Sequence, residues 1–391
     1  MKIIPYSKQF ISKKDKLEVN KVLSSDFITS GPKVELFEKK VKTFSNAKYA
    51  VAVNSATSAL HIACMSLGLK NNDLLWTVPN SFVASANCGL YCGAKIDFVD
   101  IDNETLNISI NQLEQKLSLS HKRKQLPKVL VVVHFAGVSC EMDRIKKLSN
   151  KYKFKIIEDA SHAIGGNFNN HKVGSCKYSD ITVFSFHPVK IITSGEGGMA
   201  LTNNKDLAKS MSHLRSHGII RDKKILNKKK EIRGYYEQQY LGYNYRITDI
   251  QCALGISQMN MIKNFIIHRN KIAKLYIKSL KNLDLKFQKV PSRVSSTYHL
   301  FIIRVNKTIK KKLFEEFIKN KILVNTHYIP IHTHPFYKKK GFKNGDFKVS
   351  ENYYKESISI PIFYDLKNFE QIKVIKIIKK FIKIKNKQKK C

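Results

Sequence analysis

The feature that most restricts the fold is an alternation of short apolar runs with helix-like segments from residue 49 to residue 203. The apolar runs lie near 49–53, 74–78, 95–99, 127–133, 154–158, 181–185 and 199–202. Helical segments separate most of these runs, which is typical of a largely parallel sheet with helices on both faces. The runs are mostly hydrophobic, as expected for strands that are covered on both sides. We therefore predict an α/β fold with a mostly parallel seven-stranded sheet.

Lys190 lies in an unusual segment, because no other residue from 181 to 195 is Asp, Glu, Lys or Arg. Charged residues make up 26% of the chain, so a lysine isolated in this way is one that the fold is expected to desolvate. Desolvation disfavours the ammonium form and lowers the pKa of a lysine from about 10.4. Such a lysine can act as a nucleophile near neutral pH. In the alternative interpretation, the side chain of Lys190 extends from a strand end to water.

Asp159 directly follows the apolar run 154–158, and a turn of small residues follows it. Ligands of open α/β sheets bind beyond the carboxyl ends of the strands, which is where both Asp159 and Lys190 are expected. Pyridoxal phosphate needs a lysine for its Schiff base and an acidic group that keeps the pyridine nitrogen protonated. The pair therefore indicates a site for this cofactor.

A possible phosphate cradle lies at residues 54–58, where the run 49–53 passes into Asn-Ser-Ala-Thr-Ser and then into a helical pattern. The free N–H groups and the dipole of a helix start favour an anion. Thr57 and Ser58 add side-chain donors. An ordinary helix cap explains any single turn of this kind, but three strand-end features of complementary chemistry favour a cofactor site.

Five phrases carry a resemblance to a known family. They are Ser-Ala-Thr-Ser at 55–58, Glu-Asp-Ala-Ser-His-Ala at 158–163, Phe-Ser-Phe-His-Pro-Val-Lys at 184–190, Gly-Glu-Gly-Gly at 195–198 and Gly-Tyr-Asn-Tyr-Arg-Ile-Thr-Asp at 242–249. Together they resemble the DegT-type nucleotide-sugar aminotransferases, and the likeness runs from about Tyr6 to Pro361. The segments 76–88 and 186–202 are similar to the pseudaminic-acid branch, whose members aminate a UDP-linked 4-keto-6-deoxy N-acetyl sugar at C4.

The resemblance implies the type I fold of pyridoxal-phosphate transferases. It places an N-terminal arm and a large cofactor-binding domain at 1–245, and a linking helix, a small α+β domain and a basic amphipathic tail at 246–391. It also implies an obligate homodimer with shared sites, and glutamate as the amino donor. In this interpretation Lys190 forms the Schiff base and transfers the proton, while Asp159 holds the ring nitrogen.

Further site residues are named by the same resemblance. The cofactor shell comprises Thr57, Ser58, Phe82 stacked on the ring, His162 near the phenolic oxygen or ring, Ser185 on the phosphate, and Asn244 reaching the phosphate of the other chain. The candidate substrate contacts are Tyr6, Thr29, Gly31, His327 and Tyr328. Simpler explanations remain at this stage, because an aromatic at position 82 is more often a core residue and His327 can be a structural histidine. The turn that holds Thr29 and Gly31 can also be a plain loop before a helix that starts with proline.

The remaining segments predict helices, a second sheet and a docked tail. We expect two helices within 13–46, a helical and then basic segment at 204–235 with a solvated lysine run at 228–230, and one long helix from 247 to about 280. Strands are predicted near 283–288, 298–304 and 322–325. In the tail, Ile372, Ile375, Ile378 and Ile382 would share one helical face. Packing on the small domain is favoured over a membrane surface for this helix.

The composition excludes some classes of protein. The formal net charge of +40 would suit nucleic acid. The lysines are scattered, however, with no basic stripe and no nucleic-acid motif, so we predict no such partner and ascribe the charge to compositional drift. The seven cysteines contain no Cys-x-x-Cys pair and lie mostly in apolar runs, which predicts reduced thiols and no metal site. With no signal-like N-terminus and no apolar run of 18 residues, we expect a cytoplasmic protein without a membrane partner.

Three alternatives stay open at this stage. Some relatives carry histidine in place of the Schiff-base lysine and dehydrate the sugar, and Lys190 argues against that activity here. The substrate can be another nucleotide keto sugar, with different stereochemistry or amination at C3. A non-catalytic scaffold or nucleic-acid-binding protein would be colourless, whereas a pyridoxal-phosphate enzyme is yellow.

Overall fold

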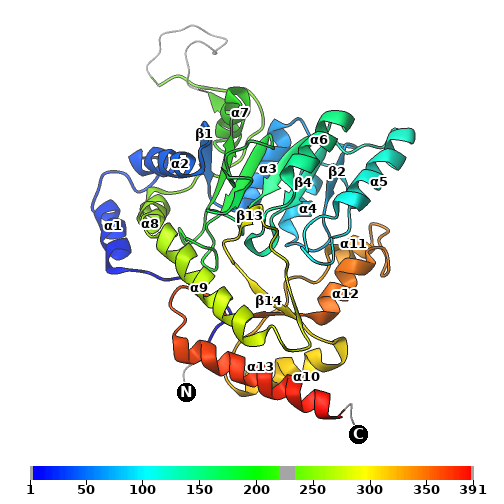
Figure 1. Ribbon diagram of the computed structural model, residues 1–391. Coiled ribbons are helices and arrows are strands. Elements are labelled where there is room, and N and C mark those ends of the chain that lie inside the picture. Colours follow the sequence, from blue (N-terminus) through cyan, green and yellow to red (C-terminus); the bar gives the residue numbers. More distant parts are fainter. Residues whose placement is uncertain (1–2, 221–233, 389–391) are drawn as a thin grey trace.

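The computed structural model describes residues 3–220 and 234–388, and its largest element is a seven-stranded sheet (Figure 1). The strands lie in the order β1-β9-β8-β5-β4-β2-β3. Their bounds are β1 (Tyr49–Val53), β2 (Leu74–Thr77), β3 (Lys95–Phe98), β4 (Val129–Val133), β5 (Lys155–Asp159), β8 (Ile181–Ser185) and β9 (Gly198–Thr202). Strand β9 pairs antiparallel with β8 and β1, while the pairs among β8, β5, β4, β2 and β3 are parallel. The predicted seven strands and the mostly parallel sheet are confirmed.

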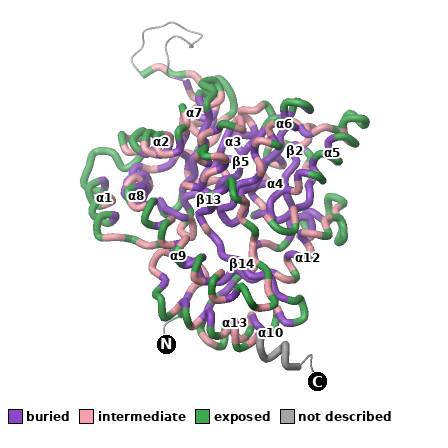
Figure 2. The backbone as a smooth tube through the Cα atoms, in the orientation of Figure 1, coloured by how far each residue is buried: buried purple, intermediate pink, exposed green. Residues whose placement is uncertain are grey.

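Helices cover both faces of this sheet, and alternate residues of each strand pack against opposite layers. Val129 and Val131 of β4 belong to the core that includes α3 (Ala56–Ser66), α4 (Ala84–Tyr91) and α7 (Lys205–Leu214). Leu130 and Val132 belong to the core that includes α5 (Ile110–Lys122) and α6 (Met142–Tyr152). The buried tube segments in the centre of Figure 2 show the same sandwich. Burial on both sides explains why a central strand such as β4 is apolar throughout, whereas the edge strand β3 includes Lys95 and Asp97.

The N-terminal segment forms the two predicted helices, α1 (Lys13–Leu23) and α2 (Pro32–Ser45). The predicted single helix from 247 to 280 is wrong, because the structure has α8 (Asp249–Met259) and α9 (Ile262–Leu280) instead. The N–H groups of Asn260 and Met261 bond to carbonyls three residues back, which tightens the chain into a turn between the two helices. The predicted lysine run at 228–230 lies outside the described residues.

The C-terminal part is a smaller α+β layer, at the bottom of Figure 1. Its antiparallel sheet has the order β12 (Lys286–Phe287), β14 (Phe301–Arg304) and β15 (Ser357–Ile360), with α10 (Lys307–Lys319), α12 (Lys348–Glu356) and α13 (Asn368–Gln388). The strand predicted at 322–325 is wrong. Only isolated bridges occur there, from Ile322 to Ile4 and from Asn325 to Ser359, because this segment passes between the N-terminal arm and β15. The strand β15 was not predicted, since it follows α12 without a turn.

Helix α13 packs along the C-terminal layer, as predicted. Ile375, Ile378 and Ile382 are buried, but Ile372 is 39% exposed and Val374 is buried in its place, so the predicted face is wrong by part of a turn. No helix within 3–220 or 234–388 is long and apolar enough to cross a bilayer. The remaining short elements are β6 (Asn167–Phe168), β7 (His171–Lys172), β10 (Ile219–Ile220), β11 (Glu237–Gln238), β13 (Val294–Ser295), α11 (Pro335–Lys338) and two 3₁₀ turns, Phe135–Gly137 and Ile331–Thr333.

Candidate active site

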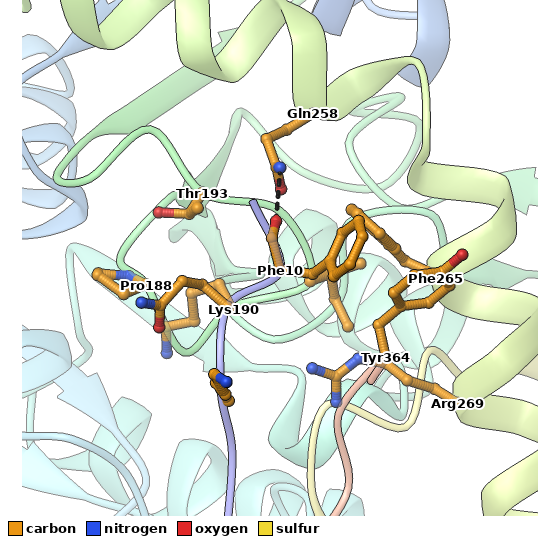
Figure 3. Close-up of a pocket in the computed structure, with 11 residues that line it drawn as sticks. Phe10, Pro188, Lys190, Thr193, Gln258, Phe265, Arg269 and Tyr364 are labelled. Carbon is orange, nitrogen blue, oxygen red and sulfur yellow. Dashed lines mark hydrogen bonds between the residues drawn. The ribbon is translucent and has the colours of Figure 1, made fainter. Parts of the chain in front are cut away.

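Lys190 lies in the turn that follows β8, where its N–H donates to the carbonyl of His187 at 2.9 Å. Its side chain is partly buried and lines a small hollow, together with Phe10, Thr193 and Arg269 (Figure 3). Burial lowers the pKa of Lys190 to about 8, although the carboxylate of Asp159 acts in the opposite direction. The structure therefore favours the desolvated lysine over one that extends to water.

Asp159 is the last residue of β5, the strand next to β8 in the sheet. Its carboxylate is 6% exposed, and both oxygens accept hydrogen bonds. Oδ2 accepts from the hydroxyl of Ser85 at 2.6 Å, while Oδ1 accepts from the hydroxyl of Ser161 at 2.6 Å and from its N–H at 3.2 Å. The carboxylate is near enough to Lys190 to raise the pKa of that amine. The structure thus brings together the two groups expected at neighbouring strand ends.

The turn from β1 into α3 has the geometry of an anion cradle. Ser55 is the N-cap of α3, and its hydroxyl accepts the N–H of Ser58 at 3.1 Å. The hydroxyl of Ser58 donates to Asn54 at 2.6 Å and so serves the turn itself. The N–H groups of Ala56 and Thr57 lie in the first helical turn, where no carbonyl of the same helix can reach them. They are the donors that an anion can use.

Gly198 of β9 keeps this turn in place. A Cβ atom on residue 198 would lie 2.4 Å from the carbonyl of Ser55 and 2.5 Å from the nitrogen of Ala56. Only glycine lets the start of α3 lie this close to the strand. The Gly-Glu-Gly-Gly phrase therefore has a packing role at the cradle, besides closing the loop that holds Lys190.

His162 is a neutral, oriented imidazole. Its Nδ1 accepts the N–H of Ala136 at 3.2 Å, so the proton lies on Nε2, which is 3.2 Å from the hydroxyl of Tyr328. Burial, with the charges of Lys190 and His327, holds the pKa of His162 well below its usual value. The ring can therefore donate a hydrogen bond near Lys190 without adding a positive charge.

The C-terminal layer contributes His327 and Tyr328 to the same place. The ring of Tyr6, from the N-terminal arm, is 5.4 Å from the ring of His327, whose Nδ1 is 2.8 Å from the hydroxyl of Ser359. Burial, and then the charge of Lys190, lowers the pKa of His327 to about 3. Burial, followed by the negative charge of Asp159, raises the pKa of Tyr328. Three of the predicted substrate residues thus lie side by side, with His327 near enough to Lys190 to be affected by its charge, and all three are neutral.

Phe82 and Ser185 complete this part of the site. Phe82 follows β2, is 59% exposed and has its ring 6.4 Å from that of Tyr328. The alternative that Phe82 is a core residue is therefore wrong, and an exposed aromatic here is suited to stacking. Ser185 is buried at the end of β8, where its hydroxyl accepts the N–H of His187 at 3.5 Å.

The other predicted residues contact different elements. Asn244 is exposed and forms an isolated bridge with Ser216. Thr29 is exposed and forms a bridge with Thr248, the N-cap of α8. The N–H of Gly31 donates to the carboxylate of Asp249 at 2.7 Å, so this donor is already used within the protein. The predicted roles of these residues in binding substrate or the other chain's phosphate stay predictions.

The sequence did not predict Ser81, Ser85 and Ser161 as site residues. Ser161 could have been found, since it lies two residues beyond Asp159, within reach of its carboxylate. Ser85 is separated from Asp159 by 74 positions and lies in a stretch of small residues without a distinctive pattern. Only the packing of α4 against the sheet brings the two side chains together.

The donor set fits pyridoxal phosphate. A lysine with a lowered pKa can bind an aldehyde, a buried carboxylate can hold a protonated ring nitrogen, and the start of α3 can bind a phosphate. An exposed aromatic, Phe82, and a neutral histidine, His162, both contact Tyr328 beside these groups. Lys190, Asp159 and the N–H groups of Ala56 and Thr57 would hold the cofactor at three separate points.

Comparison with known proteins agrees with this geometry. The model of the DegT/DnrJ/EryC1/StrS aminotransferase family matches residues 9–379. A UDP-4-amino-4,6-dideoxy-N-acetyl-beta-L-altrosamine transaminase from Campylobacter jejuni is 38% identical over 380 residues, which cover 96% of each chain.

Two solved structures are also similar. One is Helicobacter pylori PseC, an aminotransferase involved in the biosynthesis of pseudoaminic acid, with a TM-score of 0.89, 31% identity and coverage of 98% of this chain and 100% of that one. The other is a putative sugar aminotransferase, Spr1654 from Streptococcus pneumoniae, in its PMP form, with a TM-score of 0.88, 25% identity and coverage of 98% and 99%. The chain therefore belongs to the DegT/DnrJ/EryC1/StrS family and is a pyridoxal-phosphate-dependent aminotransferase.

Proposed function

We propose that this enzyme transfers an amino group from L-glutamate to C4 of a UDP-linked 4-keto-6-deoxy N-acetyl sugar, in the biosynthesis of pseudaminic acid or a related surface sugar. The observation that carries the chemistry is the pairing of a desolvated Lys190 with the buried carboxylate of Asp159 at adjacent strand ends. The choice of sugar is supported by the similarity to the altrosamine transaminase of Campylobacter and to the Helicobacter aminotransferase of pseudoaminic acid biosynthesis.

Bound pyridoxal phosphate supplies an electron sink that stabilises negative charge on the carbon next to the transferred nitrogen. The protein places and protonates the reacting atoms. Asp159 holds the proton on the ring nitrogen, because a buried carboxylate that is ionised favours the cationic partner. Lys190, with its lowered pKa, takes the proton from the α-carbon of the donor and delivers it to the C4′ atom of the cofactor. The same residues act in the reverse order on the keto sugar.

The neutral wall formed by Tyr6, His327 and Tyr328 suits a sugar. Its hydroxyl and imidazole groups can hydrogen-bond to ring substituents and to a carbonyl oxygen. Because the pKa of His327 is lowered to about 3, this side chain stays uncharged over the working range of the enzyme. The wall therefore offers directional hydrogen bonds instead of fixed charge, which matches a sugar better than the carboxylates of glutamate.

We also propose a homodimer in which Asn244 binds the phosphate of the partner chain's cofactor. Several large apolar side chains lie exposed in the segments that hold Thr29 and Asn244. Among them are Leu241 at 72%, Phe27 at 57% and Ile28 at 51% exposed. Such a surface needs a partner to cover it. Sedimentation velocity would then give a species of twice the chain mass.

The capture of pyridoxal phosphate by the cofactor-free enzyme is expected to depend on pH through Lys190. A lysine with a pKa of about 8 is about one-tenth unprotonated at pH 7 and about nine-tenths at pH 9. Only the unprotonated amine attacks an aldehyde, so the rate should rise about tenfold over this interval. Stopped-flow absorbance measures this rate. The same measurement with a free lysine analogue accounts for the titration of the cofactor itself. A rise delayed until above pH 10 would contradict the lowered pKa.

The substrate assignment is tested with a panel of nucleotide keto sugars. The enzyme is incubated with glutamate and UDP-linked 4-keto sugars that differ at C5, and with a 3-keto sugar as the matched control. NMR of the products assigns the position and configuration of the new amine. We expect turnover of the 4-keto, L-altro precursor to exceed that of the others. Preferred turnover of the 3-keto sugar, or equal turnover of both C5 epimers, would contradict the proposal.

A further inference from the structure

Two buried serines lie behind Asp159 and have no role in the proposal above. Ser85 is 0% and Ser81 is 3% exposed, and their hydroxyl oxygens are 2.8 Å apart. The hydroxyl of Ser85 is also 2.6 Å from Oδ2 of Asp159. We infer that Ser85 and Ser81 are positioning residues, which form a hydroxyl chain that holds the carboxylate of Asp159 aimed at the ring nitrogen of the cofactor. The inference rests on the proposed cofactor role of Asp159 and deepens it.

The chain of hydroxyl groups has one direction. An ionised carboxylate can only accept hydrogen bonds, so Ser85 must use its single proton on Asp159. Ser81 must then donate to Ser85. The opposite direction would place two oxygen lone pairs against each other across 2.6 Å, which is stable only when Asp159 is protonated. Hydrogen bonds in such a chain polarise and strengthen one another, so Ser81 acts on Asp159 through Ser85.

The second oxygen of Asp159 is held independently. Oδ1 accepts both the hydroxyl and the N–H of Ser161. A carboxylate has about four acceptor positions, so these two bonds and the bond from Ser85 leave a position for the ring nitrogen. Hydrogen bonds to the charged form of a carboxyl group favour that form. Each donor therefore helps to fix the carboxylate of Asp159 in place for the ring nitrogen.

The short segment that carries these serines, from the turn at 80–83 into the start of α4, also fixes the other contacts of the ring. The N–H of Ser85 donates to the carbonyl of Phe82 at 3.2 Å, and the ring of Phe82 is exposed to the site. Oδ1 of Asn80 accepts the N–H of Tyr328 at 3.2 Å. One short turn thus sets the stacking face, the partner of the ring nitrogen and the approach of the loop from the C-terminal layer. This arrangement is why we assign Ser85 a positioning role beyond filling a gap under α4.

The test compares four variants in the full-length enzyme. Ser85→Ala removes the donor, Ser81→Ala removes only the second hydroxyl, and Ser85→Cys fills the space with a weak donor. Ser149→Ala is the matched control, since Ser149 is also buried, at 5% exposed, and its hydroxyl donates to the carbonyl of Phe154 at 2.6 Å, away from Asp159. The readouts are the dissociation constant of pyridoxal phosphate and the pH midpoint of the absorbance change of the bound cofactor.

We expect Ser85→Ala to weaken cofactor binding about tenfold and to raise the pH midpoint by about one unit, since tenfold in affinity and one pKa unit are equivalent. The midpoint rises because a ring nitrogen that loses its proton withdraws fewer electrons from the nitrogen at C4′. Ser85→Cys should match Ser85→Ala in both readouts. Ser81→Ala should weaken cofactor binding by only about threefold, and Ser149→Ala should match the wild type.

The outcomes separate this inference from the proposed function. If the wild-type enzyme does not bind pyridoxal phosphate, both proposals are contradicted. If it binds, but Ser85→Ala and Ser149→Ala give equal dissociation constants and equal midpoints, only the positioning role is contradicted. If Ser85→Cys behaved like the wild type while Ser85→Ala bound the cofactor weakly, the residue would act only by filling space. That result would contradict the hydroxyl chain.

Discussion

Replacing Lys190 by alanine is expected to lower the rate of amino transfer about 10⁴-fold while leaving the fold intact. Proton transfer by a positioned side chain contributes about 10²–10⁴-fold, and the loss of the amine also removes the covalent hold on the cofactor. The side chain is only partly buried, in a turn outside the sheet, so its removal leaves no large cavity in the core. Single-turnover absorbance with glutamate measures the rate, and circular dichroism measures the fold.

The matched control is Lys8→Ala, because Lys8 lines the same hollow from the N-terminal arm and is exposed. This variant should keep the wild-type rate within about twofold, since surface substitutions have small effects. Turnover by Lys190→Ala that is comparable to that of Lys8→Ala would remove Lys190 from its role.

Replacing Asp159 by asparagine is expected to reduce the rate of the glutamate half-reaction about 10³-fold, equivalent to about 4 kcal/mol of transition-state stabilisation. Asparagine has the same shape and keeps an oxygen that can accept from Ser85, so the change removes mainly the negative charge. Without that charge the ring nitrogen loses its proton and the electron sink is weakened. Rapid-mixing absorbance of the half-reaction gives the rate.

Asp180→Asn is the control for this substitution. Asp180 also accepts a backbone N–H, from Ile156 at 2.9 Å, but it lies before β8, at the opposite end of that strand from Lys190. Its replacement should affect stability without changing the half-reaction. If Asp159→Asn retained more than about a tenth of the wild-type rate, a carboxylate on the ring nitrogen would not be required.

The sequence predicted those parts of the fold in which the pattern of apolar residues along a segment follows directly from how that segment is buried. The central strands of the large sheet are mostly apolar because they are buried on both faces, and the carboxyl ends of the parallel strands must meet at one edge. This rule alone predicts that Asp159 and Lys190 lie together. Phe82 shows its limit, since an aromatic after a strand is ordinarily a core residue, and the resemblance to a family was needed to expect an exposed one.

The predictions that failed depend on contacts distant in sequence. The break between α8 and α9 is one tightened turn within an otherwise helical pattern. The segment 322–325 has strand-like residues but only single-residue bridges to its neighbours. Ser85 looks like any small residue of a buried helix, and its role appears only when α4 is packed beside the end of β5. Periodicity cannot show such a contact, because it is a property of two segments together.

The central claim is that one amine, that of Lys190, holds a cofactor whose ring nitrogen is bound by Asp159. The most direct measurement is to load the enzyme with pyridoxal phosphate, reduce it with borohydride, digest it and locate the modified lysine by mass spectrometry. The chain has 70 lysines and arginines in all, so a single modified position is a demanding result. We predict one modified peptide, which contains Lys190. Modification at another lysine, or spread over many, would contradict the account.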